Sequence, residues 1–100
     1  MRTPAQRRNL LILRDEILPG IEEGELDMRR LFNRRGTPLC LLGHAAASGR
    51  IKKLRHVNDA DEVFGLYKSG HWVHIFGPNL PNDPTWLAAN ITDLLESDDD

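Results

Sequence analysis

Residues 34–49, RRGTPLCLLGHAAASG, decide the fold. Within this stretch residues 38–47 are apolar on nearly every helical face, with His44 as the polar exception. A helix that is hydrophobic all round is typical of the buried centre of a domain. The stretch opens with a Thr-Pro start signal, and Gly49 is well suited to a left-handed C-cap. We therefore predict a central apolar helix over about residues 38–48.

Strong helix signals also lie near both ends of the chain. Thr3 is followed by proline at the first helical position and glutamine at the third, which is typical of a capped helix start. This helix should end at Pro19-Gly20, and Asp83-Pro84 should start the last helix. Helical spacing predicts these inward residues: Leu10, Leu11, Leu13, Ile17 and Leu18 in the first helix, and Leu87, Ala88, Ile91, Leu94 and Leu95 in the last.

The segments between these helices carry weaker signals. Asp27 can cap a short helix over residues 28–32, and Asn58 can cap another over residues 59–66. The patterns of residues 51–57 and 71–76 fit either a helical turn or a short hairpin, and both interpretations stay open.

The composition is that of a single globular domain. The chain has 100 residues, of which 40% are hydrophobic and 28% charged. We predict an all-α fold over residues 1–96, with five or six short helices around the central one, followed by an acidic tail, 97–100. No apolar run approaches the roughly 20 residues of a membrane span, and the N-terminus does not resemble a signal peptide. We therefore expect a cytoplasmic protein with no membrane contact.

The charge is unevenly distributed along the chain. Residues 1–56 carry twelve Lys/Arg against six Asp/Glu, whereas residues 57–100 carry one lysine against nine acids. Either the two halves neutralise each other when packed, or the basic half binds a polyanion. Two basic clusters flank the central helix and could line one surface: Arg29, Arg30, Arg34 and Arg35, and Arg50, Lys52, Lys53 and Arg55.

Cys40 and His44 are one helical turn apart, so they could lie on one face of the central helix. With His71 and His74 they would supply a Cys-His-His-His metal site. The alternative is a buried cysteine among leucines, and the sequence favours it, because structural zinc sites have tighter, cysteine-rich spacing. A cysteine nucleophile would need a partly exposed thiol, and the leucines around Cys40 argue for burial, so we expect no catalytic residue. We also expect no metal and no cofactor.

The chain resembles a widespread family of small, uncharacterised bacterial and phage proteins. Their pattern, Cys-Gly-Thr-x-x-Cys-x-x-Gly-x-Ala, corresponds here to residues 35–45, with Arg35 in place of the first cysteine. Phe64-Gly65-Leu66, Phe76-Gly77-Pro78 and a last helix opening at Pro84 also match, so the resemblance covers about residues 27–95. It implies a small helical fold without a known activity. A role that needs both cysteines is not expected of this chain.

These observations favour a small non-enzymatic module that binds a protein partner. Such a module could be a regulator, or an inhibitor of a bacterial defence complex encoded by a phage or mobile element. Tyr67 and Trp72 are candidate interface anchors together with the basic clusters, because Trp, Tyr and Arg dominate binding hot spots. The alternative is a nucleic-acid-binding protein that uses the two clusters, although the pI of about 6.1 is low for such a domain.

Overall fold

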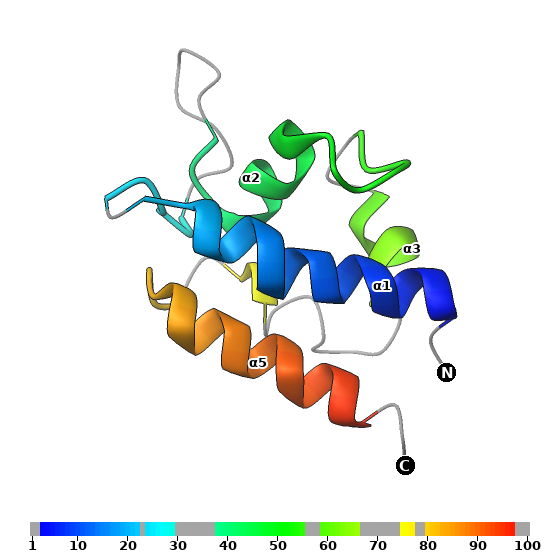
Figure 1. Ribbon diagram of the computed structural model, residues 1–100. Coiled ribbons are helices and arrows are strands. Elements are labelled where there is room, and N and C mark those ends of the chain that lie inside the picture. The colour runs from blue at the N-terminus through cyan, green and yellow to red at the C-terminus, as the bar shows by residue number, and fades with distance from the viewer. Residues whose placement is uncertain are drawn as a thin grey trace.

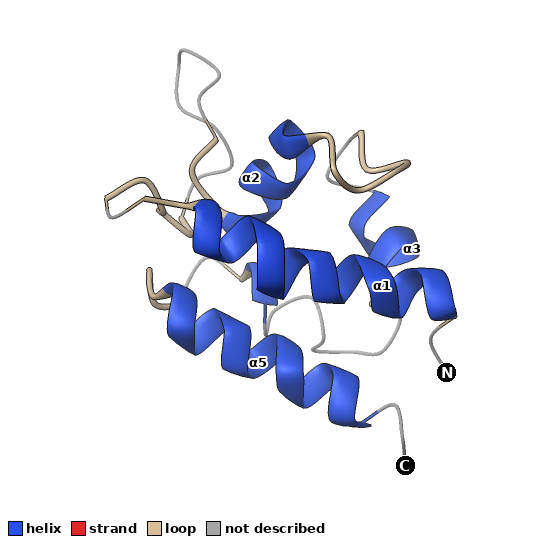
Figure 2. Ribbon diagram, viewed as in Figure 1, coloured by secondary structure: helices blue, strands red, loops and turns tan. Residues whose placement is uncertain are grey.

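The computed structural model describes residues 3–22, 24–29, 38–55, 59–66, 75–77 and 80–97. Within these ranges four α-helices have described bounds, Ile75-Phe76 are helical as well, and there is no strand, so the all-α prediction is confirmed (Figure 2). The predicted number of five or six helices is confirmed only in part. The helices are α1 (Pro4–Ile12), α2 (Leu41–Ser48), α3 (Ala60–Phe64) and α5 (Pro84–Ser97). In Figure 1, α1 crosses the middle of the molecule, with α5 antiparallel on one side and α2 and α3 on the other.

The N-terminal helix begins as predicted. The Thr3 hydroxyl accepts the Gln6 N–H at 3.1 Å, and the Gln6 side chain accepts the Thr3 N–H at 2.9 Å. This reciprocal pair is a capping box, which satisfies two backbone donors that a helix start otherwise leaves without partners.

The same helical run ends at Gly20 after two changes of geometry. Leu13–Ile17 form a π-helical turn and Leu18–Gly20 a 3₁₀ turn. Pro19 has no N–H to donate, and its ring would clash with the carbonyl four residues before it, so the α-helical pattern cannot continue to this point. Leu11 was predicted to face inward, but its side chain is 39% exposed.

The central helix begins three residues later than predicted. Cys40, in an extended conformation, is its N-cap, and Gly49 ends it with a φ of 69°. The preceding residues are engaged elsewhere, because the Leu39 carbonyl accepts the Asp27 N–H at 2.8 Å. The Leu41 N–H lies 3.5 Å from the sulfur of buried Met28. The first turn of the helix is buried as expected, with Leu41 and Leu42 almost inaccessible. The expectation of burial on every face is wrong at the other end, where Ala47 and Ser48 are exposed.

Polar side chains of α1 tie it to the ends of two other helices. Near the C-terminus of α3, the Gln6 and Asn9 amides donate to the carbonyls of Glu62 and Val63, both at 2.8 Å. Arg7 donates to the Leu95 carbonyl of α5 at 3.0 Å. These bonds fix α1 between α3 and α5.

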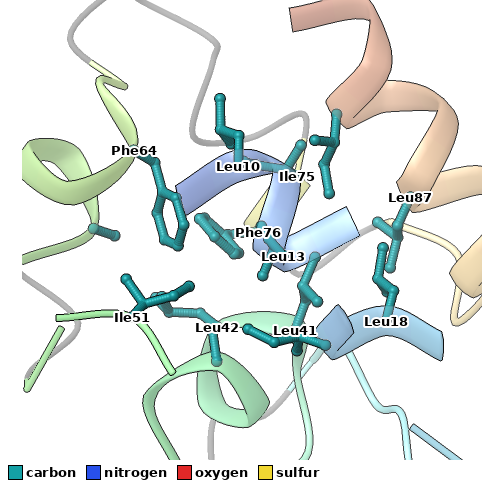
Figure 3. Close-up of a cluster of buried hydrophobic side chains, with 14 of the residues drawn as sticks. Leu10, Leu13, Leu18, Leu41, Leu42, Ile51, Phe64, Ile75, Phe76 and Leu87 are labelled. Carbon is teal, nitrogen blue, oxygen red and sulfur yellow. The ribbon is translucent and has the colours of Figure 1, made fainter. Parts of the chain in front are cut away.

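The apolar core lies where the helices meet. Figure 3 shows Leu10 of α1 and Leu13 of the π-helical turn among residues from every other helix, and Phe64 beside Phe76. The two rings are tilted, with centroids 5.6 Å apart. All the predicted inward residues of the last helix are buried except Ala88, which is half-buried.

The segments with weak signals are described only in part. The helix predicted over residues 28–32 does not begin as expected, and the interpretations left open for residues 51–57 and 71–76 are tested at the residues named next. Met28 and Arg29 form a turn, residues 51–55 form a turn, and Ile75-Phe76 are helical. The remaining residues of 28–32, 51–57 and 71–76 lie outside the described part. α3 is shorter than residues 59–66 because Gly65, with a φ of 68°, ends it. No helix in the described part of the chain has both the length and the hydropathy needed to cross a bilayer.

Candidate functional site

The second basic cluster lies on a loop that follows α2. Its centre is a turn over residues 51–54, which we call the lysine turn. In this turn the Leu54 N–H donates to the Ile51 carbonyl at 3.4 Å. Ile51 and Leu54 are buried and anchor the turn in the core, whereas Lys52 and Lys53 between them are exposed. The core therefore holds the two lysines outward on a short, fixed segment.

Lys53 has a φ of 69°, the only positive φ of a non-glycine residue in the described ranges. It stands at the third position of the turn, where a type II turn requires a positive φ and usually has glycine. A lysine in this conformation is strained by about 1 kcal/mol or more.

This turn faces α1 and α3 across a hollow of about 530 Å³, which we call the basic groove. Part of its lining is apolar, from Ala5, Ile12 and the buried Val63. The other lining residues are polar or charged: Thr3, Gln6, Arg8, Asn9, Arg50, Lys52, Lys53 and Glu62. The groove thus combines an apolar area with four cationic side chains and one carboxylate.

The cations of the basic groove differ in what they contact. Arg8, Lys52 and Lys53 make no ion pair within the described ranges. Arg50 donates through Nη1 to Oε1 of Glu16, on the π-helical turn, at 2.8 Å. Both side chains of this pair remain about half exposed, at 57% and 49%.

Arg50 also borders a second, smaller hollow. This hollow, of about 320 Å³, is lined by Glu16, Ile17, Gly20, Ile21, Pro38, His44, Ala47, Ser48 and Arg50. His44 lies at its edge, where its Nε2–H donates to the Glu25 carbonyl at 2.9 Å. The Arg50–Glu16 pair therefore stands between the two hollows.

The ion pairs with both partners in the described residues all lie within the basic half of the chain. They are Arg14–Asp15, Arg29–Asp27 and Arg50–Glu16. The side chain of Arg14 also reaches α5, where it donates to the hydroxyl of Thr92 at 3.2 Å.

The first basic cluster is described only at Arg29, since Arg30, Arg34 and Arg35 lie outside the described part. Arg29 is on the segment of residues 24–29, at the opposite end of α1 from the lysine turn (Figure 1). Arg29 is not among the residues that line the hollow beside the lysine turn. The predicted anchors Tyr67 and Trp72 lie outside the described residues as well.

The Cys40–His44 pair has separate surroundings. Cys40 is buried, and its sulfur accepts the Gly43 N–H at 3.4 Å. Burial raises the pKa of the thiol, and the N–H groups at the start of α2 lower it by a smaller amount. The described residues contain no group of three or more His, Cys, Asp or Glu side chains that could hold a metal ion. His71 and His74 lie outside the part that the structure describes.

All the groove residues from α1 and α3, and Glu16 beside the groove, were missed from the sequence. Arg8 was absent from the candidate list, although it shares a helical face with Ala5 and Ile12, which was the available signal. No sequence signal joined Glu16 to Arg50, because their contact depends on how the chain folds between them.

The comparisons with known proteins agree with one another. No protein-family model matches the chain, and neither a curated protein nor a solved structure matches it.

Proposed function

We propose that this protein is a small non-enzymatic module that binds a protein partner through the basic groove. The observation that supports this proposal is the arrangement of Arg8, Arg50, Lys52 and Lys53 around a hollow with an apolar area. Apolar area supplies binding free energy, and the cations supply orientation and a fast, steered association.

The composition of the basic groove favours a protein partner over a nucleic acid. Ala5, Ile12 and Val63 give the groove an apolar area, which suits a protein side chain and has no use for a phosphate backbone. Nucleic-acid sites gain their affinity from several phosphate contacts, which require a continuous basic surface. Arg29, the described member of the other cluster, does not line the groove.

The proposal is tested by capture from a bacterial lysate with three baits. The first is the wild type, and the second carries Lys52→Gln with Lys53→Gln. The third, Arg29→Glu, makes the same change in net charge away from the groove. We expect a protein that is retained by the wild type and by Arg29→Glu and is lost from the lysine variant, with or without nuclease. Equal retention by all three baits contradicts the proposal.

The nucleic-acid alternative is tested directly with duplex DNA. We expect affinity no tighter than about 10 μM at physiological salt, which is the non-specific range. Sub-micromolar binding that falls steeply with salt, and that the double lysine variant abolishes, would establish the alternative instead.

A further inference from the structure

The basic groove already has a carboxylate at its edge. Glu16 Oε1 accepts a hydrogen bond from Arg50 Nη1 at 2.8 Å, although Glu16 itself lines only the neighbouring hollow. The guanidinium of Arg50 therefore binds a carboxylate at the border between the two hollows. An arginine offers five N–H donors in a planar fork, so it binds carboxylates with defined geometry.

The other cations of the groove are placed for further carboxylates. Arg8 comes from α1, and Lys52 and Lys53 come from the turn across the hollow. Ile12 and Val63 supply the apolar area between these cations. An aliphatic side chain can lie on this area while acidic neighbours reach the cations on the two sides.

We propose that the basic groove binds an acidic peptide segment, in which carboxylates flank an aliphatic side chain. We further propose that one of these carboxylates replaces Glu16 on Arg50. This inference rests on the proposed function and names the class of partner. Glu16 is then an internal competitor, and it weakens binding by as much as the exposed Arg50–Glu16 pair is worth.

The chain offers a matched pair of variants for the test. Glu16→Gln removes the competing carboxylate from Arg50, whereas Asp15→Asn removes the neighbouring carboxylate, which pairs with Arg14 instead. Both variants change the net charge equally, and both positions are exposed, so both should fold, which circular dichroism checks. The probe is a fluorescein-labelled peptide with a leucine flanked by glutamates. The comparison probes are the same peptide with glutamines and a short oligothymidylate.

We expect the wild type to bind the glutamate peptide and to bind the glutamine peptide only weakly. The double variant Lys52→Gln with Lys53→Gln should bind the glutamate peptide more weakly than the wild type does. We expect Glu16→Gln to bind about two- to fivefold tighter than Asp15→Asn, the factor by which breaking an exposed ion pair shifts an equilibrium. Equal affinities for the two variants overturn the exchange at Arg50, while the lysine effect leaves the proposed function standing. Binding of the oligothymidylate alone overturns both. Binding of neither probe overturns the inference, and the lysate capture then judges the proposed function separately.

Discussion

The sulfur of Cys40 accepts the backbone N–H of Gly43 at 3.4 Å, at the buried start of the central helix. The cysteine thus occupies the position that Ser, Thr, Asp or Asn usually fills in a helix N-cap. Its side chain satisfies a backbone donor that burial would otherwise leave without a partner. The only cysteine of the chain therefore has a structural role that its own geometry explains.

Cys40→Ser should be more stable than Cys40→Ala. The serine hydroxyl can still accept the Gly43 N–H, whereas alanine removes the acceptor, and loss of an N-cap costs about 1 kcal/mol. Urea denaturation of the two variants measures the difference. If the sulfur contributed only apolar packing, alanine would be the better replacement, and the order would be reversed.

The raised pKa of Cys40 makes the stability depend on pH in the alkaline range. Because burial favours the neutral thiol, the unfolded chain loses this proton at lower pH than the folded chain. The stabilisation is fully present below the unfolded pKa of about 8.5 and is lost as the pH rises through the folded pKa. The free energy of unfolding of the wild type should therefore fall more steeply above about pH 8.5 than that of Cys40→Ser. Parallel curves would contradict this.

The lysine turn predicts opposite effects for two identical substitutions. Lys53→Gly removes a side chain from a residue with a φ of 69° and relieves its strain, so stability should be unchanged or higher. Lys52→Gly makes the same change in charge at an ordinary φ, so it should cost about 0.5–1 kcal/mol through the entropy of the unfolded chain. Thermal melting of both variants checks the order. A lower melting temperature for Lys53→Gly than for Lys52→Gly would show that the turn is not strained.

Asn9 should be sensitive to an isosteric change. Its amide donates to the Val63 carbonyl at 2.8 Å, so Asn9→Ala should cost about 1–2 kcal/mol. Asn9→Asp should cost more, because it places a carboxylate against that carbonyl. Chemical denaturation at neutral pH measures both costs. If the bond matters little to the fold, the aspartate variant will match the alanine variant.

The helix ends that depend on neighbouring residues in the sequence could be predicted. The capping box of Thr3 is formed as expected, and Asp83 accepts the Thr85 N–H at 3.0 Å at the start of α5. The start of the central helix could not be predicted in this way, because the Leu39 carbonyl is bound by Asp27. The local start signal was overridden by this hydrogen bond to a residue of an earlier segment.

The basic groove shows the same limit at the level of the site. The exposed lysines of the turn were identified from charge alone. Their placement opposite Arg8 and beside an apolar area depends on the packing of α1 against α3, which no local pattern encodes. The Glu16–Arg50 contact joins residues 34 positions apart, so it belongs to the tertiary structure alone.

The bonds that α1 makes to the other helices have a consequence for synthesis. Asn9 donates to the carbonyl of Val63, and Arg7 donates to the carbonyl of Leu95, so α1 gains its α5 partner only after residue 95 has been made. α3 has five residues and is too short to be stable alone, so it depends on this docking as well. A nascent chain lacks these contacts until α5 has left the ribosome, and we expect native structure to form only from that point.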